Sequence, residues 1–225
     1  MKKHIPNFIT CLNVLTGGLG LLAVIQGDMK VGIFYVIIAS FFDFLDGLIA
    51  RLLKVQSEFG KQLDSLADMV SFGVLPSFIL FELFSKESLD WAIVALLVIP
   101  FSALRLAKFN LASDQSDEFK GLPTPANAVM IGAIAFMYED LMNLLNKEIL
   151  LVLTALSCFL LVSNIPMIAL KFKSMAWKGN EQRYSLISLE VIGLAIFQLS
   201  FIPFVIPLYI AVSVVGNLLR KSFIE

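Results

Sequence analysis

Residues 33–68 read IFYVIIASFFDFLDGLIARLLKVQSEFGKQLDSLAD and contain the pattern that decides the fold. A long apolar run precedes two aspartates, Asp43 and Asp46, and a short polar connection leads to a second pair, Asp64 and Asp68. Residues three or four apart share one face of an α-helix, so each pair is expected to point in one direction. Helices joined by so short a connection are antiparallel neighbours, which lets the two pairs face each other.

The composition argues against a water-soluble globular domain. Of the 225 residues, 58% are hydrophobic and only 16% are charged, a balance typical of membrane proteins. The formal net charge is −1, and no basic run interleaves with aromatic residues, so nucleic acid is not an expected partner. Cys11 and Cys158 lie in apolar stretches without metal-ligand spacing and are expected to pack within helices.

A membrane span needs about 20 apolar residues, and this length predicts eight helices. They are expected near 6–26, 30–53, 60–84, 89–110, 124–145, 149–172, 184–201 and 203–221. The predicted fold class is therefore an all-α, polytopic membrane helix bundle of about eight transmembrane helices, forming a single domain over residues 1–225. The last two helices are expected to meet at a tight turn around 200–203. Pro203 and Pro207 also allow one kinked or re-entrant segment there, which keeps six or seven spans as alternatives.

The distribution of lysine and arginine predicts the orientation. With a cytoplasmic N-terminus, only Lys30, Lys86 and Lys147 of the 17 basic residues fall in outer loops. Both termini are therefore expected in the cytoplasm, together with the loops at 54–60, 111–123 and 173–183. The first apolar segment has no convincing small-residue cleavage site and is expected to be a membrane helix rather than a signal peptide.

Four carboxylates at membrane depth need a positive partner. Each costs about 2.5–3.5 kcal/mol to insert, and four at one level also repel one another. Arg51 alone does not neutralise them, whereas one or two divalent cations bound by carboxylate oxygens do. The absence of nearby His or Cys favours Mg²⁺ or Mn²⁺ over zinc. The alternative, four ordinary helix-end aspartates in water, leaves their shared spacing unexplained.

The complete pattern, Asp43-x2-Asp46-Gly47-x2-Ala50-Arg51-x8-Gly60-x3-Asp64-x3-Asp68, resembles the signature of the CDP-alcohol phosphotransferase family. The resemblance implies a metal-dependent membrane enzyme with a CDP-linked donor, CMP as the leaving group, a site facing the cytoplasm and a homodimer. By position, the four aspartates would form the metal shell, with Asp64 and Asp68 as catalytic residues and Asp68 as the base. A single displacement and a covalent intermediate both remain open.

The same resemblance predicts the donor site. Asp43, Gly47, Ala50, Arg51 and Gly60 would bind or frame the CDP-linked donor. Small side chains at Gly47 and Ala50 leave a groove for a ligand or allow close helix packing.

The first helix carries a polar stripe of Asn7, Thr10 and Asn13, and Pro6-Asn7-Phe8-Ile9-Thr10 is similar to the family's usual opening. Contact of Asn7 and Thr10 with the donor diphosphate and hydrogen bonding between helices both explain the stripe.

A second region points to the acceptor. Arg105-Leu106-Ala107-Lys108-Phe109-Asn110 and the later segment 119–127 resemble the serine-using members of the family. This implies transfer of the phosphatidyl group from CDP-diacylglycerol to the hydroxyl of L-serine, at the cytoplasmic face of the cell membrane. Arg105 and Lys108 share a helix face and are expected to contact the serine carboxylate or a phosphate. Lys108 is equally explained as a cytoplasmic basic residue.

Two alternatives remain. The first is the same chemistry on another alcohol such as glycerol 3-phosphate, although Asp114, Asp117 and Glu118 make the nearby loop unfavourable for a phosphorylated acceptor. The second is a cation-coupled transporter, which predicts carboxylates near the membrane midplane and an inverted repeat. The sequence places its aspartates toward one side and contains no visible repeat.

Overall fold

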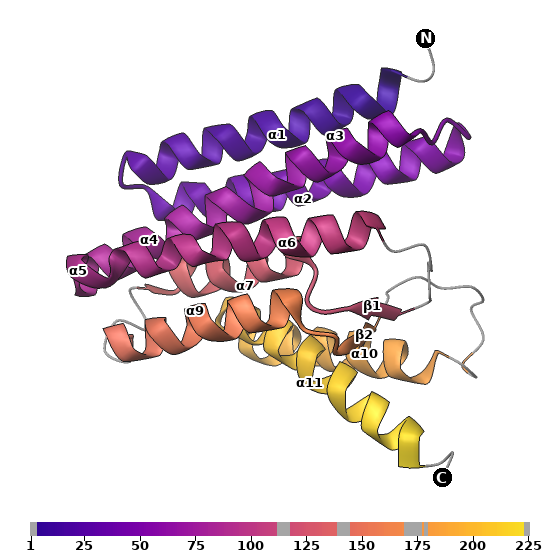
Figure 1. The fold of residues 1–225 in the computed structure, drawn as a ribbon. Coiled ribbons are helices and arrows are strands. Elements are labelled where there is room, and N and C mark those ends of the chain that lie inside the picture. The colour runs from indigo at the N-terminus through magenta and orange to yellow at the C-terminus, as the bar shows by residue number, and fades with distance from the viewer. Residues whose placement is uncertain (1–3, 112–117, 139–144, 169–176, 178–179, 223–225) are drawn as a thin grey trace.

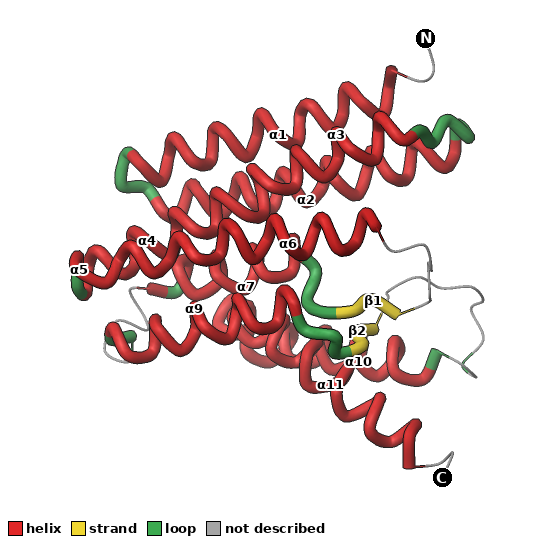
Figure 2. Tube along the Cα trace, in the orientation of Figure 1, coloured by secondary structure: helices red, strands yellow, loops and turns green. Residues whose placement is uncertain are grey.

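The computed structural model describes residues 4–111, 118–138, 145–168, 177 and 180–222. Helices make up most of this part and pack side by side as a bundle (Figure 1, Figure 2). In chain order they include α1 (His4–Ile25), α2 (Met29–Leu52), α3 (Glu58–Asp68), α4 (Leu75–Glu87), α5 (Leu89–Ala92), α6 (Val98–Leu111), α7 (Thr124–Phe136), α9 (Lys147–Val162), α10 (Glu181–Phe197) and α11 (Ile202–Ser222). The predicted helical fold is confirmed for these residues.

Four helical stretches of the described part are long and apolar enough to cross a membrane, and they match the first four predicted spans within a few residues. They are His4–Ile25, Met29–Leu52, Glu58–Glu87 and Leu89–Leu111. Large apolar side chains such as Phe34 and Ile196 are exposed, whereas Asn13, Ser71 and Ser102 are fully buried. An apolar surface around an interior that also buries polar side chains is expected of a bundle surrounded by lipid.

The stretch Glu58–Glu87 is the centre of the bundle. In its most apolar 18-residue segment, 61% is buried, against 22–33% in the corresponding segments of the other three long stretches. Between α3 and α4 the chain forms a π-helix, Met69–Val74, in which the Leu75 N–H donates to the Val70 carbonyl five residues earlier. The main core gathers around this stretch and includes Phe72, Leu75, Ile79, Leu80, Leu83 and Phe84.

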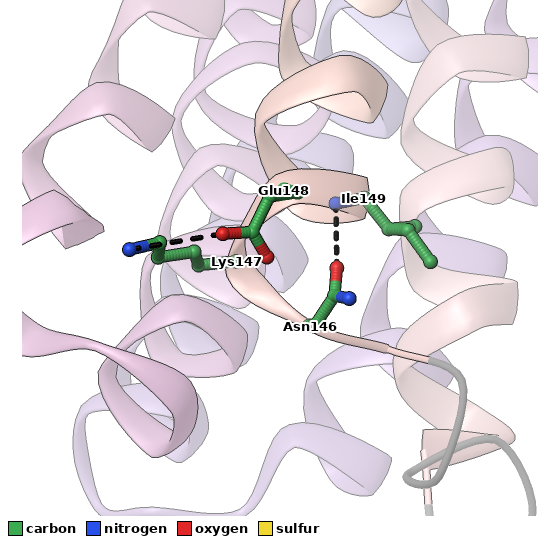
Figure 3. A network of polar contacts seen from close by, with 4 residues as sticks. All are labelled: Asn146, Lys147, Glu148 and Ile149. Carbon is green, nitrogen blue, oxygen red and sulfur yellow. Dashed lines mark hydrogen bonds and ion pairs between the residues drawn. The ribbon is translucent and has the colours of Figure 1, made fainter.

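Side-chain caps define where three of the helices begin. Asp28 accepts a hydrogen bond from the Val31 N–H at the start of α2, and Ser57 accepts one from the Gly60 N–H at the start of α3. Asn146 caps α9 in the same way by accepting from the Ile149 N–H at 2.9 Å (Figure 3). Each cap satisfies a backbone donor that the helix leaves unpaired. The Lys147–Glu148 ion pair beside the α9 cap is largely exposed and adds little stability.

The second half of the chain departs from the predicted spans. The helix expected at 124–145 ends at Phe136, and residues 139–144 lie outside the described part. The helix expected at 149–172 ends at Val162, because Ser163 adopts an extended conformation. The last two predicted helices are distinct, as expected. Their turn lies slightly early, at Gln198–Phe201, where Gln198 has a φ of 52°, and α10 and α11 then pack against each other.

Two short strands, which the sequence did not predict, lie at one end of the bundle. β1 (Glu118–Lys120) and β2 (Pro166–Ile168) pair antiparallel, with Phe119 opposite Met167. The start of α1, the end of α11 and the α2–α3 connection lie at this same end, which we call the strand end (Figure 1). A second, smaller core packs beside the strands and contains Leu122, Met130, Leu160, Met167, Ile168, Leu186 and Tyr209.

Candidate active site

The two aspartate pairs meet between α2 and α3, which both pack against α1. One carboxylate oxygen from each of Asp43, Asp64 and Asp68 lies within 4.8 Å of the other two. This grouping follows from the sequence, because the i, i+4 spacing of Asp64 and Asp68 places both on one face of α3, the face toward Asp43. The predicted convergence of the two pairs is therefore present for three of the four aspartates.

The three carboxylates are enclosed, and two of them have an oxygen without a partner among the described residues. Asp68 is 8% exposed, and Asp43 and Asp64 are half-buried. The Oδ1 atoms of Asp64 and Asp68 are buried without a hydrogen-bond partner among the described residues. Buried, unpaired carboxylate oxygens are costly unless a cation or proton compensates them. Three such groups offering oxygen ligands suit a hard divalent cation.

Asp46 lies apart from this grouping and is held by α1. Its Oδ2 accepts a hydrogen bond of 2.5 Å from the Thr10 hydroxyl, and its side chain is 6% exposed. The predicted polar stripe of α1 thus contacts the aspartates directly through Thr10. Asn13 is fully buried, but its side-chain nitrogen and oxygen have no partner among the described residues. The part of Asp46 in a metal shell stays a prediction.

Arg105 is the cation beside the cluster. It is only 7% exposed and lies within electrostatic range of Asp68 and Asp43. Its Nη1 donates to the Thr124 hydroxyl at 3.3 Å, and its guanidinium lies over the Phe109 ring, 5.2 Å from the centroid. Arg105 offsets part of the negative charge of the aspartates while its planar group is held in one orientation.

Lys108 does not share this environment. Its side chain is exposed, and its amine donates to the Val162 carbonyl at the end of α9, 3.3 Å away. The predicted Arg105–Lys108 pair is thus divided between an enclosed cation at the cluster and an exposed one. This division favours the interpretation of Lys108 as a basic residue of the strand end.

The small residues of the signature differ in their surroundings. A Cβ added to Gly47 would meet no atom within 4 Å, so open space rather than a tightly packed helix lies beside it. At Gly60 an added Cβ would lie 3.3 Å from the Asn7 Oδ1, which places Asn7 against the start of α3. Ala50 is half-buried and Arg51 is exposed at the end of α2. Gly47 fits the predicted ligand groove, whereas Gly60 permits a close helix contact.

Comparison with known proteins places these residues in a family. The model of the CDP-alcohol phosphatidyltransferase family matches residues 3–172, which include all four aspartates and Arg105. The chain belongs to this family. Helices α10 and α11 follow the matched region.

Several relatives within the CDP-alcohol phosphatidyltransferase family carry a more specific name. The CDP-diacylglycerol–serine O-phosphatidyltransferase of Mycobacterium bovis is 34% identical over 144 residues, covering 60% of this chain and 50% of its own. The protein of that name from Helicobacter pylori (strain 26695) is 32% identical, covering 76% and 74%. The one from Methanocaldococcus jannaschii is 38% identical, covering 56% and 58%. The chain thus spans about half the length of the mycobacterial relatives it matches.

Sequence reasoning missed Thr124 as a partner of Arg105. This residue lies within the 119–127 segment that pointed to the serine-using members of the family, but a threonine after a proline also reads as an ordinary helix start. Thr124 is fully buried at the first position of α7. Its position next to Arg105 depends on how α6 and α7 pack, which the sequence pattern does not contain.

Proposed function

We propose that this chain transfers the phosphatidyl group of CDP-diacylglycerol to the hydroxyl of L-serine, producing phosphatidylserine and CMP. The observation that carries the proposal is the convergence of Asp43, Asp64 and Asp68 beside the enclosed Arg105, with unpaired oxygens on the last two aspartates. The family match and the names of the relatives support a CDP-linked donor and serine as the acceptor.

Asp43, Asp64 and Asp68 would hold Mg²⁺ or Mn²⁺. Asp46, which accepts a hydrogen bond from Thr10, would complete the metal shell. A divalent ion bound there would neutralise the donor diphosphate and stabilise the departing CMP. The open space beside Gly47 would admit the cytidine nucleotide, between Ala50 and Arg51 on α2 and Asn7 on α1. Binding would bring the diphosphate of the donor to the carboxylate cluster.

Bond changes in the proposed reaction are confined to one phosphorus atom. The bond between the lipid-side phosphorus and the oxygen that bridges it to CMP breaks, and CMP leaves with that electron pair. A new bond forms between the phosphorus and the serine hydroxyl oxygen. The hydroxyl proton passes to the Asp68 carboxylate, which general-base catalysis requires to be within hydrogen-bond reach of the acceptor. Asp64 would share the ligand shell and keep Asp68 oriented.

Arg105 would recognise the acceptor. A guanidinium pairs with a carboxylate or a phosphate through parallel hydrogen bonds, and Arg105 is held beside the cluster by Thr124 and Phe109. The serine carboxylate is the group we assign to it. Lys108, exposed and bonded to Val162, would have at most an indirect role.

We further propose eight transmembrane spans with both termini and the strand end in the cytoplasm. The start of α1 and the end of α11 lie at one end of the bundle (Figure 1), which supports this topology, as does the excess of basic residues predicted there. CDP-diacylglycerol would then enter sideways from the inner leaflet of the cell membrane. The functional unit is proposed to be a homodimer.

Release of CMP by purified protein in detergent tests the reaction. CDP-diacylglycerol would be supplied with Mg²⁺ or Mn²⁺ and with L-serine, glycerol 3-phosphate or inositol phosphate as the acceptor. We expect serine-dependent release that stops on chelation, returns on adding metal and is lost in Asp68→Asn. Asp28→Asn is the matched control, because Asp28 only caps α2 and asparagine caps helices equally well.

Each result has a defined meaning. Release that depends on a different acceptor would keep the family chemistry and contradict serine as the substrate. An Asp68→Asn variant as active as Asp28→Asn would contradict the assignment of Asp68 as the base. Absence of release with every acceptor would contradict the proposed reaction.

A further inference from the structure

Helix α11 holds strand β2 through three polar side chains. The Tyr209 hydroxyl donates to the Ile168 carbonyl at 2.9 Å, and the Ser213 hydroxyl accepts from the Ile168 N–H at 3.2 Å. The Asn217 amide donates to the Pro166 carbonyl at 2.6 Å. These three residues are four apart, so they lie along one face of α11. Both edges of a short strand are therefore occupied, one by β1 and the other by α11.

Strand β2 in turn fixes the loop that enters α7. Lys120 of β1 pairs with Pro166, the Gly121 N–H donates to the Ile165 carbonyl, and the Leu122 N–H donates to the Leu160 carbonyl. Gly121 has a φ of 76°, and an added Cβ would lie 2.8–3.0 Å from three backbone carbonyl oxygens. Only glycine fits there without moving the backbone. The loop is thus held against the end of α9 in one conformation.

The loop ends at the residue that binds Arg105. Thr124 begins α7 three residues after Gly121, is fully buried, and accepts a hydrogen bond from Arg105. Tyr209 is 7% exposed and lies within electrostatic range of the same guanidinium. A continuous set of contacts therefore runs from α11 through β2, β1 and Thr124 to Arg105, which interacts electrostatically with Asp68 and Asp43.

We propose that Tyr209, Ser213 and Asn217 are positioning residues that set the place of Arg105, and so the binding of the acceptor. This inference rests on the proposed function and deepens it, by assigning a role in acceptor recognition to a helix that lies beyond the region matched by the family. The three residues act through the strand pair and Thr124 and touch neither substrate. Their loss changes the affinity for the acceptor more than the affinity for the lipid donor.

Tyr209→Phe is the sharpest variant, because it removes one oxygen atom and keeps the ring in the second core. We expect the KM for the acceptor to rise about threefold to tenfold, the range for one buried hydrogen bond, with the KM for CDP-diacylglycerol unchanged. Ser77→Ala is the matched control, since Ser77 also donates a buried hydrogen bond to a backbone carbonyl, that of Ala95. In an Arg105→Lys background, Tyr209→Phe should add little, because both changes act on one interaction.

Amide hydrogen exchange provides a measurement independent of turnover. Exchange at Gly121 and Leu122 should accelerate in Tyr209→Phe and stay at the wild-type rate in Ser77→Ala. An acceptor KM equal to wild type in Tyr209→Phe, or unchanged exchange at the loop, overturns the inference while leaving the proposed function intact. A wild-type protein that releases no CMP with any acceptor overturns the proposed function and this inference together.

Discussion

The α2–α3 region and the α10–α11 region bury polar groups of opposite kinds. In α3 the enclosed groups are the carboxylates of Asp64 and Asp68, each of which has a buried oxygen without a partner among the described residues. In α11 the enclosed groups, Tyr209 and Ser213, are fully engaged with the backbone of β2. Unsatisfied groups indicate a ligand site, whereas satisfied ones indicate support for a site. Only the first region falls within the family match.

The largest expected effect tests which region carries the chemistry. Asp43→Asn and Asp64→Asn should each lower kcat for CMP release about a thousandfold, about 4 kcal/mol, because loss of a charged oxygen ligand weakens the metal site. Asn217→Ala, an equally local change in α11, should cost about tenfold or less in kcat/KM. Comparable losses in the two regions would break the distinction between site and support.

The space beside Gly47 gives a smaller effect. Gly47→Leu should raise the KM for CDP-diacylglycerol by about tenfold or more, because the side chain would fill the proposed nucleotide groove and displace binding contacts. Gly18→Leu is the control, since an added Cβ at Gly18 also meets nothing within 4 Å. Titration of donor in the release assay measures both. Equal KM values in the two variants would place the donor elsewhere.

The two basic residues of α6 sharpen the comparison further. Arg105→Lys keeps the charge but loses the planar fork, and we expect the KM for serine to rise about tenfold. Lys108→Ala should change it less than about twofold, as Lys108 is exposed and bonded to a backbone carbonyl. Titration of serine in the CMP-release assay with each variant measures which of the two residues contacts the acceptor. A larger effect at Lys108 would reverse the assignment of the acceptor contact.

The smallest expected effect lies at the contact between α1 and the aspartates. Thr10→Val is nearly isosteric and removes the hydroxyl that donates to Asp46. Loss of one hydrogen bond to a carboxylate should lower kcat about threefold to tenfold, with little change in either KM. Thr16→Val is the control, because the Thr16 hydroxyl donates only to Leu12 in its own helix. Identical rates in both variants would leave Asp46 without a part in turnover.

Hydropathy and spacing predicted the first half of the molecule well. The lengths of the first four spans and the facing aspartate pairs follow from local pattern and from a short connection. Such features depend on residues close in sequence. The separation of Asp46 from the other aspartates depends instead on how deeply α1 packs against α2, for which the sequence has no periodic signal.

The second half was less predictable because its structure depends on distant partners. Three-residue strands are too short to show an alternating pattern, and β1 and β2 exist because residues 118–120 and 166–168 meet. The mostly apolar residues 163–172 satisfied a length rule for a membrane helix, but Tyr209, Ser213 and Asn217 provide an alternative set of partners for the backbone at 166–168. Hydropathy reports neither the pairing of β1 with β2 nor the hydrogen bonds from α11 to β2.

The π-helix after Asp68 has a consequence for how the chain tolerates changes in length. A π turn takes up one more residue than an α turn. Removal of one residue from 69–74 would therefore leave a regular α-helix in which the side chains of α3 and α4 keep their present directions. Removal of one residue between Asp64 and Asp68 would instead rotate Asp64 by about 100° relative to Asp68 and the core. Length variation among relatives in this central helix is therefore expected to concentrate in these six residues.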